Sequence, residues 1–147
     1  MARLLVALVC SAGIALAACA RQPESFPAAM QPLDWVAVAD VGTPQIVTTD
    51  PDGALRETKL WFVVVEGDGY IRTGDSRWFR NLQRDPTLVM RIEGQAYPLR
   101  AELVVDDALR ARLNQTFREK YGVSDFLVHP FGAPDANLLR LHPRTVR

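Results

Sequence analysis

The chain has 147 residues, 48% of them hydrophobic, and its 17 basic and 17 acidic side chains balance to a formal net charge of zero. This length suits a single domain behind a short leader. The balance of charge excludes the strongly basic face that bulk nucleic-acid binding requires, so we expect no nucleic-acid partner.

The first 18 residues have the layout of a secretory signal. Arg3 provides a minimal positive region, the apolar run over 4–15 is too short to span a bilayer, and small residues follow it. The stretch Leu16-Ala17-Ala18-Cys19 resembles the bacterial lipobox at all four positions, with an ordinary signal peptide and a chance cysteine as the alternative. The resemblance implies that residues 1–18 are a lipoprotein signal peptide and that lipidated Cys19 anchors the chain to a membrane.

The residues around Cys19 also predict a location. Ala20 follows the lipidated residue, and the lipoprotein pattern then implies the outer membrane, facing the periplasm, if the source has two membranes. A Gram-positive source would change this place in the cell envelope but not the anchor. Because Cys10 lies in the signal and Cys19 carries the lipid, the mature chain has no disulfide and no thiol for redox or zinc chemistry, and we expect no metal site.

Residues 19–32 are predicted to form a flexible tether, because prolines recur there among polar residues. The folded domain is expected over 33–147. It begins with 33–41, where a short helix is favoured over a strand, and continues with a strand over 44–49, a turn over 50–53 and a strand over 56–66. Within that last strand, 60–65 is apolar without alternation, which is typical of a central strand buried on both faces.

The next stretch combines a hairpin with a short helix. Gly67-Asp68-Gly69 predicts a turn into a strand over 70–73. The residues from Asp75 to Pro86 then predict an amphipathic helix with Asp75 or Ser76 as its N-cap. Helical spacing puts one set of side chains on a packing face and another on the opposite face: Trp78, Phe79 and Leu82 on the first, and Arg77, Arg80, Asn81 and Arg84 on the second.

Arg77 occupies an unusual position in this predicted helix. It lies in the first turn, where the helix dipole is positive and a cation is unfavourable. Helix amides, the Ser76 hydroxyl and an arginine together form an anion site, so a bound phosphate would compensate the charge. The alternative is that Arg77 pairs with Asp75 or extends into solvent.

The remaining residues predict two strands, a longer helix and a closing strand. Strands are expected over 87–92 and 96–105, the second with Leu99, Ala101, Leu103 and Val105 on one face. Asp106 or Asp107 is expected to cap a helix that ends at Gly122, with a core-facing stripe of Leu109, Leu113, Phe117 and Tyr121. A loop over 126–134 and a strand over 137–142 complete the order, which predicts a small α+β barrel.

Several runs of this sequence resemble one known superfamily. They are Lys59-Leu60-Trp61-Phe62-Val63-Val64, Gly69-Tyr70-Ile71-Arg72-Thr73, Arg77-Trp78-Phe79-Arg80-Asn81-Leu82 and Asp85-Pro86. Over about 44–105 the chain resembles the FMN-binding split-barrel superfamily, typified by pyridoxamine phosphate oxidase. Two branches are similar: the deazaflavin-dependent nitroreductases, whose Trp-Tyr-x-Asn-Leu-x-Ala-x-Pro signature matches Trp78 to Pro86 except at Phe79 and Arg84, and small split-barrel proteins of unknown function. The implied fold class is α+β, a small antiparallel split β-barrel with two or three helices.

The resemblance also implies a cofactor site. The cofactor would be FMN or a deazaflavin coenzyme, and the reacting atom would belong to it rather than to a catalytic side chain. Its phosphate would be held by the strand that ends at Arg72-Thr73 and the helix start at Ser76-Arg77, with Lys59 and Trp61 near the ring. The full set of expected cofactor-binding residues is Lys59, Trp61, Thr73, Ser76, Arg77, Trp78 and Asn81.

The resemblance leaves three functions open. The leading one is a lipid-anchored protein that binds the cofactor and reduces a small organic acceptor, as a homodimer because split barrels usually dimerise across the cofactor site. The second is a non-enzymatic envelope lipoprotein whose degenerate split barrel, without a cofactor, is a binding or interaction module. The third, drawn from some split-barrel relatives, is haem binding through His129 or His142.

Overall fold

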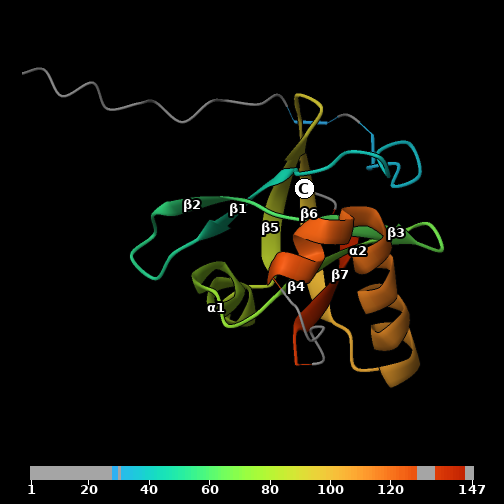
Figure 1. Ribbon diagram of the computed structural model, residues 1–147. Helices are drawn as coiled ribbons and strands as arrows, with labels where there is room; N and C mark the ends of the chain where they lie inside the picture. The colour runs from blue at the N-terminus through green and yellow to red at the C-terminus, as the bar shows by residue number, and fades with distance from the viewer. Residues whose placement is uncertain (1–27, 30, 129–134, 145–147) are drawn as a thin grey trace, which may run out of the picture.

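The computed structural model describes residues 28–29, 31–128 and 135–144, which form a curved antiparallel sheet and two helices (Figure 1). The elements are, in chain order, β1 (Gln45–Thr49), β2 (Leu55–Lys59), β3 (Phe62–Val65), β4 (Asp68–Thr73), α1 (Arg77–Arg84), β5 (Thr87–Ile92), β6 (Gln95–Leu103), α2 (Asp107–Val128) and β7 (Asn137–Pro143). The strands lie in the order β2-β1-β5-β6-β7-β4-β3. This is the α+β split barrel that the sequence predicts.

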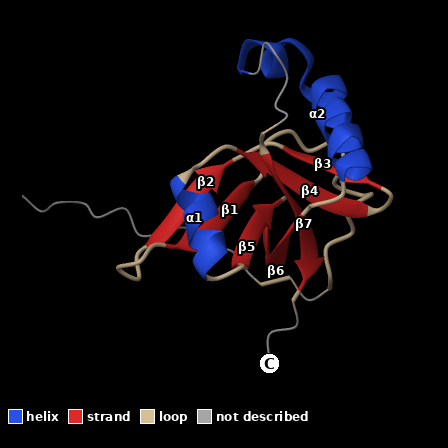
Figure 2. Ribbon diagram, turned by 90° about the horizontal axis from the view of Figure 1, so that it is seen from below, coloured by secondary structure: helices blue, strands red, loops and turns tan. Residues whose placement is uncertain are grey.

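Two cores hold the sheet and the helices together. The interior core lies within the curve of the sheet, is closed by α1, and includes Ile46, Phe62, Ile71, Met90, Leu99 and Leu141. The second core lies between α2 and the β3 side of the sheet (Figure 2) and includes Val63, Tyr70, Leu138, Leu113 and Phe117. The predicted apolar stripe of α2 is therefore confirmed, with Leu109 and Tyr121 packed against its two buried members.

The single central strand predicted over 56–66 is wrong. The chain breaks at Leu60 and Trp61, where β2 ends beside β1 and β3 begins beside β4. These two strands are the opposite edges of the sheet, so the two-residue break connects its edges. β3 is apolar on both faces because Phe62 points into the interior core while Val63 packs beneath α2. Its burial reflects cover by a helix and not a central place in the sheet.

Residues 33–41 form neither the favoured helix nor the alternative strand but a series of turns. Asp34 Oδ1 accepts hydrogen bonds from the Val36 and Ala37 amides at 3.0 and 3.3 Å. A side chain that binds its own backbone in this way competes with helix formation. Trp35 is 5% exposed and anchors the turns in the interior core.

Two tight hairpins set the register of the sheet. Glu66-Gly67 and Glu93-Gly94 have positive φ at both central positions, of 55° and 82° and of 48° and 76°, as a two-residue hairpin turn requires. The first turn lies one residue earlier than Gly67-Asp68-Gly69 predicts, because Val65 pairs with Asp68.

Two element ends differ from the prediction. β6 ends at Leu103 and not at 105. Leu103 and Val105 are exposed rather than on the buried face of the strand, and Val104 is buried in their place. The Val104 amide donates to Leu138 O at 2.9 Å. Gly122, with φ 49° and ψ −121°, breaks α2 as expected, but a second helical segment continues to Val128 in place of the first residues of the predicted loop. The Asp106 side chain accepts from the Leu109 amide at 2.7 Å and caps the helix.

Part of the predicted tether pairs with the sheet. Ala28 forms a parallel bridge with Ala96, and the Ala29 amide donates to Ala96 O at 2.9 Å. The signal peptide, Cys19 and His129 lie outside the described residues. Neither α1 nor α2, the helices of the described ranges, has the length and apolar character needed to cross a membrane.

Candidate functional site

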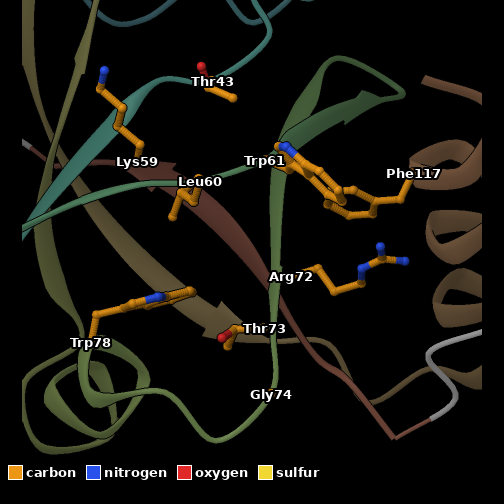
Figure 3. A pocket seen from close by; sticks show the side chains of 9 residues that line it. All are labelled: Thr43, Lys59, Leu60, Trp61, Arg72, Thr73, Gly74, Trp78 and Phe117. Atoms are coloured by element: carbon orange, nitrogen blue, oxygen red, sulfur yellow. The ribbon is translucent and has the colours of Figure 1, made fainter. Parts of the chain in front are cut away.

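A cavity of about 380 Å³ opens where the chain passes from β2 to β3, and we call it the crossover pocket. The residues that line it come from the ends of β2 and β4, the loop before β1, the β2–β3 link, the start of α1 and α2 (Figure 3). They are Thr43, Lys59, Leu60, Trp61, Arg72, Thr73, Gly74, Trp78 and Phe117. Four of the seven predicted site residues are thus brought together: Lys59, Trp61, Thr73 and Trp78. Trp78 and Thr73 lie at one end, Thr43 at the other, and Trp61 and Phe117 on the side of α2, while the Lys59 side chain extends away from Trp78 and Arg72 (Figure 3).

Aromatic side chains make one wall of the pocket rigid. Trp61 stacks on Tyr121 with ring centroids 4.6 Å apart and an interplanar angle of 12°. The Tyr121 hydroxyl lies 2.7 Å from Gly42 O and accepts a hydrogen bond from the Phe62 amide at 3.0 Å. Burial raises the pKa of Tyr121, so the hydroxyl stays neutral at physiological pH. The wall can therefore offer a flat, preformed surface to a planar ligand.

Lys120 fixes α2 to the crossing from outside the pocket lining. Its Nζ donates to Ala39 O, Val41 O and Phe62 O at 2.7, 2.9 and 3.0 Å, and lies 4.0 Å from the centroid of the Phe62 ring. Burial lowers the pKa of Lys120. Its contacts hold the turn before β1 and the start of β3 against the same helix.

The two cations of the crossover pocket differ in availability. The Arg72 side chain is 4% exposed, forms an ion pair with Asp125, and lies 4.5 Å from the centroid of the Phe117 ring. Lys59, at the exposed end of β2, makes no ion pair with any acidic residue that the structure describes. Lys59 is therefore the cation most accessible to an anionic ligand.

The predicted phosphate corner, formed by Thr73, Ser76 and Arg77, has polar side chains that already bind one another or neighbouring residues. Thr73 Oγ1 donates to Ser76 Oγ at 3.0 Å. Ser76 Oγ also accepts from the Phe79 amide at 3.2 Å, so Ser76 and not Asp75 is the N-cap of α1. Arg77 is 69% exposed and its Nη2 lies 3.9 Å from Asp50 Oδ2. Asp75 pairs instead with Arg80 at 2.8 Å. Neither Ser76 nor Arg77 lines the crossover pocket.

The prediction that Asn81 lies on the exposed face of α1 is wrong, because its side chain is buried and Asn81 is only 3% exposed. Its Nδ2 donates to Thr48 Oγ1 at 3.1 Å and to Asp50 Oδ1 at 2.7 Å. Asn81 is four residues after Arg77 and three after Trp78, so it lies near the border of the two predicted faces, and the prediction puts it on the wrong one. It joins α1 to β1 rather than lining the pocket.

The predicted set lacks five of the nine residues that line the pocket: Thr43, Leu60, Arg72, Gly74 and Phe117. Phe117 was expected only as part of the core-facing stripe of α2, and it does pack there while one side also lines the cavity. No local signal distinguishes such a residue, because the cavity exists only once α2 lies across the β2–β3 crossing.

The haem hypothesis receives no support from His142. Its Nε2 lies 2.7 Å from Glu102 Oε2 on the sheet, and it does not line the crossover pocket. Within the described ranges, no cluster of three or more histidine, cysteine or acidic side chains could bind a metal ion.

Comparisons with solved structures identify the fold. HutZ, the heme storage protein from Vibrio cholerae, is 22% identical with a TM-score of 0.56, over 71% of this chain and 82% of that one. A candidate pyridoxamine 5′-phosphate oxidase from Listeria innocua is 14% identical with a TM-score of 0.57, over 76% and 92%. An F420 reductase is 16% identical with a TM-score of 0.51, over 84% and 97%. At these identities the likeness shows a shared split-barrel fold.

Sequence comparison identifies the family. No curated protein matches the chain in sequence. One family model, described as "Uncharacterized protein conserved in bacteria (DUF2255)", matches residues 36–138. This range includes β1 to β6, both helices and every residue that lines the crossover pocket. The chain therefore belongs to the DUF2255 family of bacterial proteins, and its domain has the split-barrel fold.

Proposed function

We propose that the crossover pocket binds a flavin-type cofactor, FMN or a deazaflavin coenzyme, and that the bound cofactor reduces a small organic acceptor. One observation carries the proposal: three aromatic rings and a lysine that pairs with none of the described acidic residues line the same cavity, where the β2–β3 link joins the two sheet edges. A planar ring with an anionic tail matches this combination. The structural likeness to an F420 reductase and to a candidate pyridoxamine 5′-phosphate oxidase supports it.

The residues present fit such a group. The cavity volume of about 380 Å³ lies within the range of pockets for small molecules and cofactors. Trp61 and Trp78 provide surfaces for a ring, Lys59 provides charge for an anionic tail, and the Thr43 and Thr73 hydroxyls provide hydrogen bonds. When bound, the cofactor would supply the electron transfer, while these side chains bind and orient it.

The remaining predicted site residues act through α1 in this proposal. Ser76 caps the helix and holds Thr73, while Asn81 fixes the helix to β1. Arg77 would have to leave Asp50 to reach a phosphate. We propose further that lipidated Cys19 anchors the protein in the bacterial cell envelope, and that two copies associate as a homodimer across the pocket.

The test begins with full-length protein purified from membranes. Its absorbance spectrum should contain a flavin or deazaflavin band, and titration of cofactor-free protein with FMN should quench the flavin fluorescence. Lys59→Gln should weaken FMN binding by about 1.5–3 kcal/mol, roughly 10- to 150-fold, because it removes one charge-assisted bond. Riboflavin, which lacks the phosphate, should bind both proteins equally.

Two variants control this measurement. Arg118→Gln removes an exposed charge from α2 outside the pocket lining and should leave FMN affinity unchanged. Arg77→Gln should have a smaller effect than Lys59→Gln because its guanidinium lies beside Asp50. The absence of any cofactor band together with no binding of FMN or a deazaflavin would reject the proposal.

A second candidate is the non-enzymatic envelope lipoprotein with a degenerate barrel. The observation that favours it is the internal use of the phosphate corner, where Ser76 caps α1 and Arg77 lies near Asp50. A strictly monomeric protein that binds neither cofactor would support this candidate over the first.

A further inference from the structure

Three backbone carbonyl oxygens surround one cation where α2 meets the β2–β3 crossing. They belong to Ala39, Val41 and Phe62, and we call them the carbonyl cage. The Lys120 ammonium lies 2.7, 2.9 and 3.0 Å from these oxygens and 4.0 Å from the centroid of the Phe62 ring. An ammonium has three N–H donors, so the cage provides an acceptor for each of them. The cage therefore matches a primary ammonium rather than a planar guanidinium.

The carbonyl cage adjoins two residues that line the crossover pocket. Trp61 directly precedes Phe62, and Thr43 lies two residues after Val41. The side chains of Trp61 and Thr43 are both seen at the pocket in Figure 3. A shift of the cage would therefore move two parts of the pocket wall.

The sheet and the carbonyl cage fix these segments in different ways. Within the sheet, the Leu60 amide donates to Pro44 O at 3.1 Å and joins the two segments to each other. The cage joins both of them to α2 through Lys120. Phe117, which also lines the pocket, precedes Lys120 by three residues, so the two side chains are neighbours on the helix. The cage thus sets the position of the α2 wall relative to the rest of the pocket.

We propose that the carbonyl cage is a binding site for a primary ammonium, which Lys120 supplies, and that its occupancy positions α2 for a ring ligand in the crossover pocket. The inference rests on the proposed function for the ligand and adds a positioning residue to the same site. Lys120 does not line the pocket and acts through Phe117 and Trp61. A wall that is already in place binds a ring more tightly, because less order has to be created on binding.

Chemical rescue of full-length Lys120→Ala tests this site. The substitution removes the side chain beyond Cβ, and n-propylammonium replaces the missing atoms. Riboflavin is the probe because it is neutral, and its fluorescence quenching should show binding about tenfold weaker than to wild type, a change usual for coupled sites. n-Propylammonium chloride should restore the affinity with a saturable dependence. Tetramethylammonium chloride, which has the same charge but no N–H donor, should restore none of it.

Two further variants control this measurement. Arg118→Ala shortens an exposed cation of α2 outside the pocket lining and should leave riboflavin affinity unchanged. Lys120→Met keeps an apolar stem without a donor, so it should bind riboflavin weakly and should not be rescued, because its stem fills the place of n-propylammonium. Lys120→Met also provides the test if Lys120→Ala fails to fold. Wild-type affinity in a Lys120 variant that folds, or equal rescue by the two ammonium salts, would overturn the inference.

Hydrogen exchange separates this inference from the proposed function. The Phe62 amide, which donates to the Tyr121 hydroxyl, should exchange faster in Lys120→Ala and slow again with n-propylammonium. If the wild type binds no flavin or deazaflavin, the proposed function fails and this exchange decides the inference: rescue would support it, and unchanged exchange would overturn it. If riboflavin binds the wild type and Lys120→Ala equally, the positioning role is overturned while cofactor binding stands.

Discussion

At the scale of single residues, Asp50 connects the β1–β2 hairpin to α1. Arg56 donates two hydrogen bonds to its carboxylate at 2.8 and 2.6 Å, and Asn81 donates a third at 2.7 Å. The bonds from Arg56 and then Asn81 hold the pKa of Asp50 well below its ordinary value. One carboxylate thus positions the helix whose first turn reaches the crossover pocket.

Asp50→Asn should lower the free energy of unfolding at pH 7 because it removes the charge that these donors stabilise. A lowered pKa in the folded state means that the stabilisation is fully present above the unfolded value, about 3.9, and is lost as pH falls below it. In urea unfolding, the difference between the two midpoints should therefore be the same at pH 7 and pH 5 and smaller at pH 3. Asp52→Asn removes an exposed carboxylate from the same turn and controls for net charge. A difference that grows in acid would contradict the prediction.

At the scale of elements, the turns over 33–41 make one especially close contact with the sheet. The Trp35 ring lies directly over Gly69 of β4, so that a Cβ on Gly69 would come within 2.3 Å of the ring. A glycine is required here by the close approach of an aromatic ring and not by a positive φ. The contact explains why a segment without helix or strand is well packed.

Gly69→Ala should lower the free energy of unfolding by about 1–3 kcal/mol, the usual cost of overpacking a core. Trp35 would have to move, so its fluorescence should change as well. Gly42→Ala is the matched control, because no atom lies within 4 Å of its added Cβ. Equal urea midpoints for Gly69→Ala and the wild type would show that Trp35 adjusts without cost.

At the scale of the whole molecule, the two-residue link between β2 and β3 brings both sheet edges to one place. α2 covers this crossing through Tyr121 and Lys120, and α1 begins beside it. The pocket is therefore built from elements far apart in the chain, while the N-terminal residues at 28–29 reach the sheet elsewhere, at Ala96. The proposed lipid anchor at Cys19 and the residues of the proposed ligand site therefore belong to different parts of the sequence.

The predicted anchor can be tested with the whole chain expressed in bacteria. Wild-type protein should incorporate labelled fatty acid, and Cys19→Ser should incorporate none, because the thiol is the attachment point. Cys10→Ser is the control, since Cys10 lies in the predicted signal and should leave labelling intact. Labelling that persists in Cys19→Ser would reject lipidation at this residue.

Local chemistry made much of this fold predictable from the sequence. The hairpins at 66–67 and 93–94 need glycine at positive φ, α1 has a serine cap and a proline-directed end, and the α2 stripe recurs every four residues. Each of these signals lies within a few residues of the structure that it determines, so neighbours along the chain suffice to specify it.

Only the tertiary structure decided where these elements meet. The break between β2 and β3, the burial of Asn81 and the place of Phe117 in the pocket depend on partners such as Tyr121, which is 59 residues from Phe62. The sequence by itself determined an α+β split barrel and predicted a site near Lys59, Trp61, Thr73 and Trp78. Long-range packing decided that these four side chains share one cavity and that Ser76, Arg77 and Asn81 lie outside its lining. No local pattern in a sequence specifies which distant element will cover a given face.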